Sequence, residues 1–217
     1  MEIVAQVDVG ARGLVALTFD DGPSQYTPPI VELLARHGAR ATFFVEGQAI
    51  AGNEETLRRT AREGHELGNH AWSHPRPRAR TDQELRDELR RTSRAIYDAT
   101  GVDARLLRPP YGTDAARYAR IGAELGLTPT VLWSVDGYDY QEVAAEDIVT
   151  FVRSTIRPGA IVLLHDGRRA DRPTVEALAE ILADLTARDY RSLTVSELLA
   201  ASTTDMAAGR DAAPRLM

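Results

Sequence analysis

The sequence predicts a single α/β domain in which a mainly parallel sheet is wrapped by helices. Short apolar runs alternate with amphipathic segments along almost all of the 217 residues, which gives about seven β-α units. The chain is 43% hydrophobic and 27% charged, as is ordinary for a globular protein with a substantial core. Such units build either a doubly wound sheet or a closed barrel, and the residues leave both arrangements open.

Apolar runs that end in polar or turn-forming residues predict the strands. These runs cover residues 14–19, 41–45, 65–69, 104–107, 130–135, 160–164 and 191–195. Amphipathic segments between them predict helices over residues 27–37, 53–63, 81–100, 114–125, 146–156 and 173–186. From residue 200 onward Ala, Thr, Asp and Gly dominate. We therefore expect one domain over residues 1–199 and a flexible tail over 200–217.

Two helix starts are marked by characteristic residues. Thr27 is followed by Pro28 and Pro29, and proline is favoured in the first turn of a helix. Thr81 begins the sequence TDQE, which is a capping-box pattern. The long helix that follows carries many charges, and we expect them to lie on a solvated outer face. They include Arg86, Asp87, Glu88, Arg90 and Arg91.

Composition argues against several kinds of protein. The formal net charge is −6, which disfavours electrostatic binding to nucleic acid or to anionic membranes. There are no cysteines, so any metal must be held by histidine and carboxylate. No apolar run approaches the ~20 residues of a membrane helix, and Glu2 and Asp8 stand where an export signal would be basic and then apolar. We expect a cytoplasmic protein, with secretion after signal removal as the alternative; the sequence does not decide the oligomeric state.

Polar side chains collect where the predicted strands end. Asp20 and Asp21 follow the first strand in the stretch LVALTFDDGP. A surface Asp-Gly turn without a catalytic role is the alternative interpretation of this stretch. The other strand ends carry His70, Arg108, Asp136, Asp139 and His165. In a β/α barrel these ends open on one face, which is where such folds place their active sites. This shared position favours an active site, although Asp136 could equally support the site or simply end its strand.

Two histidines and a carboxylate have the pattern of a metal site. His70 and His74 in NHAWSHP are four residues apart, which on one helical turn would put both imidazoles on the same face. A packed loop around Trp72 and Pro75 is the alternative. With Asp21, the histidines would supply two nitrogens and one oxygen, a catalytic zinc-like set that leaves a position open for water. Such a site accepts zinc, cobalt, manganese or nickel, and we expect zinc.

Five motifs resemble those of the polysaccharide deacetylases, also called the NodB-homology domain or carbohydrate esterase family 4. In chain order they are TFDDGP, the HxxxH of NHAWSH, RPPYG, WSVDGYDY and the LLH of IVLLHDG, and the match runs from about Val15 to Leu199. The resemblance implies a distorted, incomplete (β/α) barrel of about seven parallel strands. It also implies a metal-dependent hydrolase that removes acetyl groups, mostly from N-acetylglucosamine polymers and in some members from acetylated xylan.

The resemblance assigns roles around the metal. Asp20 would be the general base, and Arg108 would hold its carboxylate and lower its pKa. The metal ligands would be Asp21, His70 and His74. A metal there would polarise the acetyl carbonyl and lower the pKa of its bound water to about 7, so that a carboxylate can complete deprotonation.

Further roles concern the leaving group and the acetyl pocket. His165 would be the general acid, kept protonated by Asp139, because an amine anion is a very poor leaving group. The backbone N–H of Tyr111 would stabilise the oxyanion. Leu163 and Tyr140 would line the pocket for the acetyl methyl. The residues expected to bind the substrate or the oxyanion are Tyr111, Tyr140, Leu163 and Pro110.

Two positions depart from the family pattern. Ala71 follows His70 where the family usually has Ser or Thr, so a hydroxyl that steadies the metal loop is missing. Tyr140 follows Asp139 where the family usually has Trp, which changes the shape of the acyl pocket. Neither departure removes a residue that performs chemistry.

The sequence is compatible with three functions. The preferred one is a metal-dependent N-deacetylase acting on an acetylated amino sugar or its oligomer. An intracellular amidase or esterase acting on a small acylated metabolite is the alternative, motivated by the missing export signal and the altered pocket. A binding domain without catalysis is the third. Rim loops would choose the substrate, and Arg168 and Arg169 either contact it or form a solvated loop.

Overall fold

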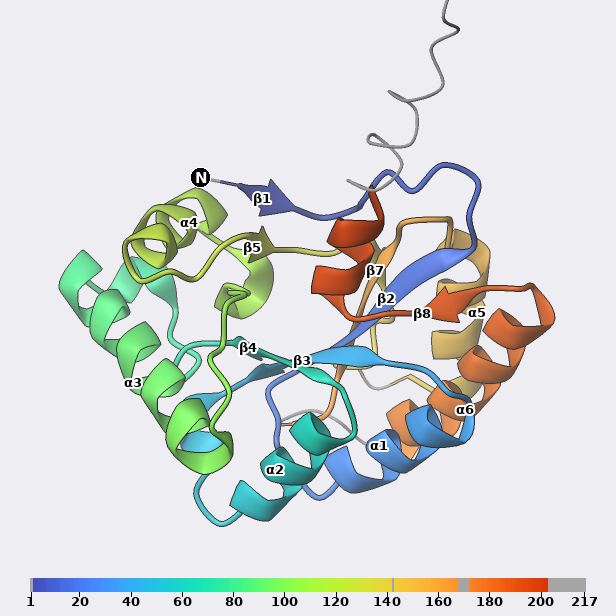
Figure 1. Cartoon of the computed structure of the whole chain (residues 1–217), viewed down its shortest axis with the longest axis horizontal. Coiled ribbons are helices and arrows are strands. Elements are labelled where there is room, and N and C mark those ends of the chain that lie inside the picture. Colours follow the sequence, from blue (N-terminus) through green and yellow to red (C-terminus); the bar gives the residue numbers. More distant parts are fainter. Residues whose placement is uncertain (1, 142, 168–171, 203–217) are drawn as a thin grey trace, which may run out of the picture.

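Strands and helices alternate along the chain in the computed structural model, which describes residues 2–141, 143–167 and 172–202 (Figure 1). Within these residues the strands are β1 (Ile3–Val4), β2 (Leu14–Asp20), β3 (Ala41–Val45), β4 (Glu66–Asn69), β5 (Thr130–Val131), β6 (Val135–Asp136), β7 (Ile161–His165) and β8 (Arg191–Ser192). The helices are α1 (Thr27–Arg36), α2 (Glu54–Arg62), α3 (Asp82–Thr100), α4 (Ala115–Glu124), α5 (Ala145–Thr155) and α6 (Arg172–Ala187).

A further helix covers residues 195–202, so it continues past the predicted domain end at residue 199. The rest of the predicted tail, residues 203–217, lies outside the described residues, as do Arg168 and Arg169. Among the described residues, no helix has the length and apolar character needed to cross a membrane.

Strand β2 lies at the centre of the main sheet, whose order is β4-β3-β2-β7-β6, and β8 pairs with the start of β2. All of these pairs are parallel. Beyond β4, Leu107 forms single parallel bridges to Asn69 and to Thr130, and β5 pairs with β1. The chain then continues from β5 into β6, which pairs with β7. The strands therefore curve into the irregular, incomplete barrel that the resemblance implies.

Three predicted strands are wrong in their extent. The strand predicted over residues 191–195 is only β8 (Arg191–Ser192), because a helix begins at residue 195. Residues 104–107 do not form a strand, because only Leu107 makes strand bridges there, and the pairing cannot continue beyond Arg108 because Pro109 and Pro110 have no N–H. The predicted strand over residues 130–135 is two short ones, β5 and β6. Between them the backbone changes partner, since Leu132 N–H donates to the Val4 carbonyl and Ser134 N–H to the Ile161 carbonyl.

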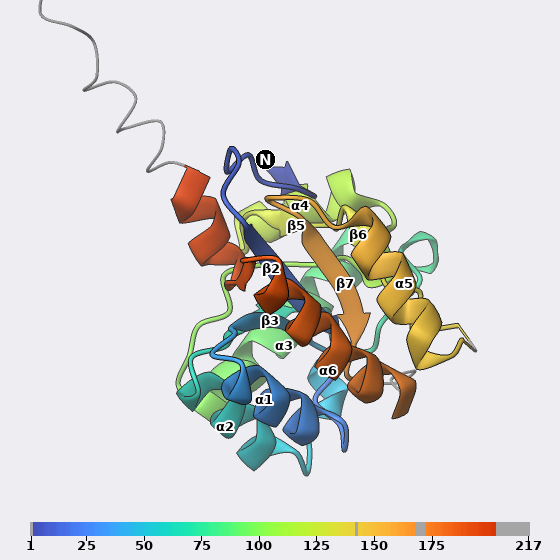
Figure 2. The same cartoon turned by 90° about the vertical axis from the view of Figure 1, so that its right-hand side faces the viewer.

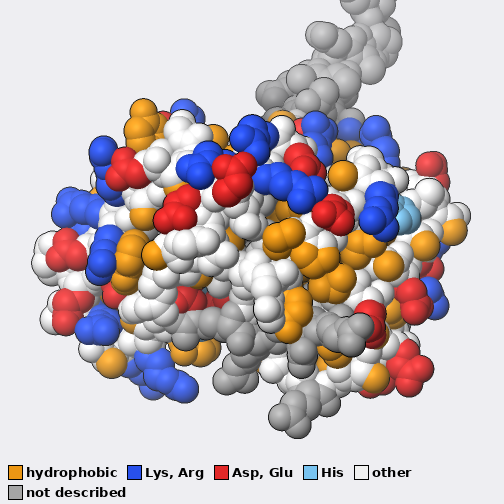
Figure 3. All heavy atoms as spheres, turned by 90° about the horizontal axis from the view of Figure 1, so that it is seen from below, with side chains coloured by type: hydrophobic (Ala, Val, Ile, Leu, Met, Phe, Trp, Pro, Cys, Tyr) orange, Lys and Arg blue, Asp and Glu red, His pale blue; other side chains and the backbone are white. Residues whose placement is uncertain are grey.

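Helices cover the outside of the strands and contact one another in the order α5, α6, α1, α2, α3, α4. Figure 2 shows α1, α5 and α6 lying over the side of the barrel that β2 and β7 form. The largest core cluster fills this interface and includes Leu17, Phe19 and Val162. The face in Figure 3 carries acidic and basic side chains intermixed, with hydrophobic side chains between them.

Side chains alternate along β2, so that one set packs beneath the helices and the other set points into the barrel interior. Leu17 and Phe19 belong to the core beneath the helices, whereas Ala16 belongs to a separate cluster that also contains Phe44 of β3. Because side chains alternate along a strand, Thr18 and Asp20 lie on the same side as Ala16. Both are buried, so β2 brings polar groups into the barrel interior at its carboxyl end.

Candidate active site

The strand register places two of the predicted catalytic residues side by side. Asp20 is the last residue of β2 and pairs in parallel register with His165, the last residue of β7. Asp21 then turns away with a φ of 73°, in the left-handed region that a non-glycine residue rarely adopts. Strand and turn together direct two adjacent carboxylates into one site, so the surface-turn interpretation of Asp20 and Asp21 does not hold: both are buried.

Arg108 is a fully buried cation that binds Asp20. Its Nη1 donates to Asp20 Oδ1 at 2.8 Å and to Thr18 Oγ1 at 2.7 Å. Its Nε donates to the carbonyl of Val131 at the end of β5, and its Nη2 donates to the carbonyl of Leu132 just after it. The guanidinium is therefore held in one position by groups on three sides, and its charge is compensated.

The Arg108 charge sets the ionisation of Asp20. Burial opposes the ionised form, but the charges of Arg108, His70 and His165 and the hydrogen bond from Arg108 outweigh it and lower the pKa of Asp20 below its ordinary value. For Asp21 the balance is reversed. Burial raises the pKa of Asp21, and the neighbouring charge of Asp20 adds to this, against the opposing effect of His70.

The predicted metal ligands converge. Ligand atoms of Asp21, His70 and His74 all lie within 4.8 Å of one another. Asp21 Oδ1 lies 3.5 Å from His70 Nε2 and 3.4 Å from His74 Nε2. This oxygen is buried and has no hydrogen-bond partner among the described residues. A buried acceptor without a donor is costly unless a cation occupies the position it faces, so the residues present fit a metal ion.

A second hydrogen bond fixes the tautomer of His70. Its Nδ1 lies 2.8 Å from the Arg108 carbonyl oxygen. Because a carbonyl only accepts, Nδ1 must carry a proton, which leaves Nε2, the atom that faces Asp21, as the nitrogen that a metal could use. A hydrogen bond of this kind orients a metal-binding histidine and raises its basicity.

His70 and His74 do not lie on a helical turn, so this part of the prediction is wrong. Residues 70–74 form a loop, in which Ala71 has a φ of 63° and His74 a φ of 52°. Left-handed residues interrupt a helix, and the imidazoles meet because the loop turns back, with ring centroids 5.1 Å apart. The packed loop that the sequence offered as an alternative therefore also carries the two histidines of the candidate metal site.

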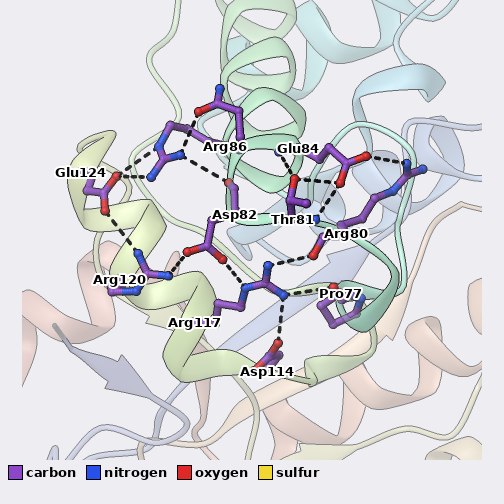
Figure 4. A network of polar contacts seen from close by, with 11 residues as sticks. Pro77, Arg80, Thr81, Asp82, Glu84, Arg86, Asp114, Arg117, Arg120 and Glu124 are labelled. Carbon is purple, nitrogen blue, oxygen red and sulfur yellow. Dashed lines mark hydrogen bonds and ion pairs between the residues drawn. The ribbon is translucent and has the colours of Figure 1, made fainter.

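Polar contacts fix the chain that follows His74 (Figure 4). Arg117 of α4 donates to Asp82 Oδ1 at 2.6 Å, to the Pro77 carbonyl at 3.1 Å and to the Arg80 carbonyl at 2.8 Å. Residues 77–80 are thereby tied to the start of α3 and to α4.

The acid side of the site is a hydrogen-bonded pair. His165 Nδ1 lies 2.8 Å from Asp139 Oδ1, and the His165 backbone N–H donates to Asp139 Oδ2 at 2.8 Å. Thr174 Oγ1 donates to the same Oδ2 at 3.0 Å. Burial by itself would lower the pKa of His165, but the hydrogen bond and charge of Asp139, helped by Asp20 and Asp21, raise it to about 9.

These residues surround a cavity of about 400 Å³. Its described lining consists of Asp20, Asp21, His70, His74, Tyr111, Gly112, Trp133, Asp136, Tyr140, Leu163 and His165. Tyr140 packs edge-on against His165, with ring centroids 5.5 Å apart. Pro110 is buried and is not among the described lining residues; it begins the 3₁₀ turn η3 (Pro110–Gly112) that presents Tyr111.

Tyr111 lies at the rim beside a metal-ligand candidate. Its φ is 60°, its side chain is exposed, and its ring contacts the His74 ring with centroids 4.3 Å apart. Its backbone N–H has no acceptor among the described residues, so it is available to an oxygen of a bound substrate.

Sequence reasoning missed Trp133 and Asp166. Trp133 lines the cavity from within the WSVDGYDY segment, and an aromatic residue inside that motif was the signal that could have found it. Asp136, for which two interpretations stood equal, lines the cavity too. Asp166 is buried under the first loop, where Gly22 N–H and Thr27 Oγ1 donate to its carboxyl group. Burial raises the pKa of Asp166 to about 7. The signal for Asp166 was its position next to His165.

The expectation that the charges of α3 lie on a solvated outer face is wrong for Glu88, and Arg91, although exposed, also contacts the neighbouring loop. Glu88 accepts hydrogen bonds from Trp72 and Ser73 in the loop that carries the histidines. The Arg91 guanidinium lies 3.6 Å from the centre of the Trp72 ring. The reason is that α3 passes beside this loop, a tertiary contact that a charge pattern does not reveal.

Known proteins resemble this chain in sequence. A model of the family described as polysaccharide deacetylase matches residues 9–130. The peptidoglycan-N-acetylglucosamine deacetylase PgdA of Listeria monocytogenes is 37% identical over 185 residues, which are 85% of this chain and 38% of PgdA. The chain thus spans well under half the length of that relative. The chitooligosaccharide deacetylase of Bradyrhizobium sp. (strain ANU 289) is 43% identical over 162 residues, 74% of each chain.

Solved structures resemble it in fold. The Bc1960 peptidoglycan N-acetylglucosamine deacetylase superposes with a TM-score of 0.85 at 30% identity, over 90% of this chain and 92% of that one. BA3943 from Bacillus anthracis, described as a CE4 family pseudoenzyme, gives a TM-score of 0.83 at 30% identity, over 91% and 69%. The match in motifs, in sequence and in fold leads to one conclusion: this chain belongs to the polysaccharide deacetylase family, carbohydrate esterase family 4.

Proposed function

We propose that this protein is a metal-dependent hydrolase that removes acetyl groups from an N-acetylated amino sugar or its oligomer. The observation that carries the proposal is the convergence of Asp20 and His165 on one cavity with the Asp21, His70 and His74 trio. A base, an acid and a metal-ligand set are the parts that amide hydrolysis requires. PgdA and the chitooligosaccharide deacetylase, the two sequence relatives named above, are deacetylases of such sugars, which supports the substrate class.

Asp21, His70 and His74 would hold a divalent metal, for which we propose zinc. Two imidazole nitrogens and one carboxylate oxygen are a ligand set of catalytic zinc sites. When bound, the metal would polarise the acetyl carbonyl and lower the pKa of a water molecule to about 7.

Asp20 would take the proton from the attacking water. Its Oδ2 lies 3.6 Å from His70 Nε2, beside the metal-ligand set, while its Oδ1 is bound to Arg108. The Arg108 hydrogen bond fixes the carboxylate and keeps it ionised, because it lowers the pKa of Asp20. Asp20 is therefore poised to accept a proton without binding the metal itself.

Tyr111 and the pocket residues would hold the acetyl group. The Tyr111 N–H would donate to the oxyanion that forms when water attacks the carbonyl carbon. Leu163 and Tyr140 line the same cavity as the two catalytic residues and would contact the acetyl methyl.

His165 would protonate the departing amine. Asp139 binds its Nδ1, which leaves Nε2 to serve the substrate, and keeps the imidazole protonated near neutral pH. The proton moves from His165 Nε2 to the sugar nitrogen as the C–N bond breaks, which gives acetate and a free amine.

The test is acetate release from N-acetylglucosamine oligomers, acetylxylan and small N-acetylated compounds, using metal-stripped and zinc-reloaded protein. We expect zinc-dependent release from the oligomers, and a loss of about 10²–10⁴-fold in kcat for Asp20→Asn with zinc still bound. Release only from small compounds would move the substrate to acylated metabolites. Zinc binding without release from any substrate would overturn the proposal in favour of a binding domain.

A further inference from the structure

The loop that carries both histidines is held from outside by a carboxylate on α3. We infer that Glu88 is a positioning residue for the metal site: it fixes the backbone of residues 70–74 so that the His70 and His74 imidazoles meet Asp21. This inference rests on the proposed function, because it assigns Glu88 a task in that same site.

Three hydrogen bonds join Glu88 to the loop. Its Oε2 accepts from Trp72 N–H at 2.9 Å and from Ser73 N–H at 2.7 Å, and its Oε1 accepts from Ser73 Oγ at 2.8 Å. Both backbone donors lie between the two metal-ligand candidates. A carboxylate accepts such bonds more strongly than a neutral group, so one side chain fixes the middle of the loop.

The opposite edge of the loop is fixed by backbone. Gly47 N–H donates to the Ala71 carbonyl and Gln48 N–H to the Trp72 carbonyl, each at 3.0 Å. Asn69 Oδ1 accepts from Ala71 N–H at 2.9 Å. The loop is thus held through its carbonyls on one side, and Glu88 supplies the acceptor for its N–H groups on the other.

Backbone conformation explains why the loop needs such support. Ala71 and His74 both have φ in the left-handed region, which L residues adopt only when the surroundings hold them there. Ala71 carries no hydroxyl, so its own side chain cannot form a hydrogen bond that would steady the loop. Without the Glu88 contacts, Trp72 and Ser73 could relax, and the imidazole of His74 would leave its place beside Asp21.

Glu88 is itself rigidly placed. Its neighbours Leu85 and Leu89 are fully buried, and Thr92 Oγ1 donates to the Glu88 carbonyl at 3.0 Å. One turn on, the Arg91 guanidinium covers the Trp72 ring. Helix α3 therefore presents two side chains to the loop from a fixed frame.

The experiment measures zinc affinity by competition with a chelating dye for wild type, Glu88→Ala, Glu88→Gln and Asp87→Asn. We expect Glu88→Ala to raise the zinc Kd by about 10–100-fold. Glu88→Gln should fall between Ala and wild type, because its amide oxygen still accepts from the backbone. Asp87→Asn is the matched control on the same helix, where the side chain contacts Gln83 and Arg90 outside the loop, and its Kd should equal that of wild type.

Kinetics provide the second readout. At saturating zinc, Glu88→Gln should lower kcat while KM for an N-acetylglucosamine oligomer stays within about twofold, since the residue touches no substrate. A zinc Kd for Glu88→Gln equal to wild type, with kcat also unchanged, would overturn the inference, and this arm stands even where Glu88→Ala does not fold. Wild-type protein that binds zinc but releases no acetate would overturn the proposed function and leave the zinc-affinity result intact. Wild-type protein that binds no zinc would overturn both.

Discussion

The charge on His165 depends mainly on its hydrogen-bonded neighbour Asp139. Burial pushes the pKa of His165 down, and the hydrogen bond and charge of Asp139 push it up, with Asp20 and Asp21 adding to this, so that the pKa of His165 reaches about 9. A general acid must be protonated to act, so activity should decline as pH rises through this pKa. The positive charge of a bound metal would lower the pKa of His165, so that this decline in activity would occur at a lower pH.

Replacing Asp139 by Asn should move the alkaline limb of the kcat/KM profile to lower pH. The amide has no negative charge to hold the imidazolium, while burial still lowers the pKa of His165, so less protonated acid is present at each pH. We also expect kcat at pH 8 to fall by about 10²-fold. The measurement is kcat/KM from pH 6 to pH 10 for both proteins. An alkaline limb at the same pH in Asp139→Asn would show that another group carries it.

Arg108 has a structural task as well as an electrostatic one. It binds Asp20 and the Val131 and Leu132 carbonyls in the protein interior, so Arg108→Met would leave a buried carboxylate unpaired. Breaking a buried pair in this way costs about 3–5 kcal/mol of the free energy of unfolding. Urea unfolding at pH 7 measures the loss. Thr18→Val provides the comparison, since it removes two hydrogen bonds of a neutral side chain, one from Arg108 and one to the Val162 carbonyl, and should cost about 1–2 kcal/mol. Equal losses in the two variants would contradict this account.

Residues at strand ends were predictable and residues that act through tertiary contacts were not. Asp20 and His165 each follow an apolar run and His70 follows the short strand HELGN, and parallel strands bring such ends to one rim. Glu88 stands among Arg86, Asp87, Arg90 and Arg91, and its type and spacing match those of a solvated helix surface. Only the packing of α3 against the loop distinguishes it, and the sequence does not encode that contact in any local pattern.

At the scale of elements, helices were predicted better than strands. Helix α1 begins at Thr27 and α3 is capped by Thr81, both as the proline and TDQE signals indicate. Strand extent depends on which partner supplies hydrogen bonds, and the partners of residues 104–107 and 130–135 are distant in sequence. Pro109 and Pro110 were the one local sign that strand pairing would not continue beyond residues 104–107.

The α3 cap offers a test of how independent the elements are. Thr81 Oγ1 accepts from Glu84 N–H, and Glu84 Oε2 accepts from Thr81 N–H at 2.6 Å. Thr81→Ala should therefore lower the free energy of unfolding by about 1 kcal/mol. Because the cap lies at the start of α3 and the Glu88 contacts lie nearly two turns further on, the zinc Kd should stay within about twofold of wild type. Thermal or urea unfolding and a zinc titration measure the two effects. A much larger zinc Kd would mean that the position of the whole helix, rather than Glu88 alone, determines the conformation of residues 70–74.

At the scale of the whole molecule, the proposed metal site can form only when the chain is folded. Asp21 follows β2, and His70 and His74 follow β4, so the three candidate ligands come from segments about fifty residues apart that the parallel sheet brings together. Strand β3 lies between β2 and β4, and helices α1 and α2 must pack for that order to form. A ligand that binds the folded state alone stabilises it by mass action.

Zinc should therefore raise the unfolding temperature of this protein. At a free zinc concentration of about 100 Kd the gain is about 2.7 kcal/mol, less any binding by the unfolded chain. For a domain of this size that corresponds to a rise in Tm of roughly 5–10 °C. Thermal unfolding of metal-stripped protein with increasing zinc measures the shift. His74→Ala removes one ligand and should abolish most of it, whereas His37→Ala alters an exposed histidine at the end of α1 and should leave it unchanged. Equal shifts in His74→Ala and wild type would place the bound zinc elsewhere on the molecule, because only the loop that Glu88 supports brings this histidine to Asp21.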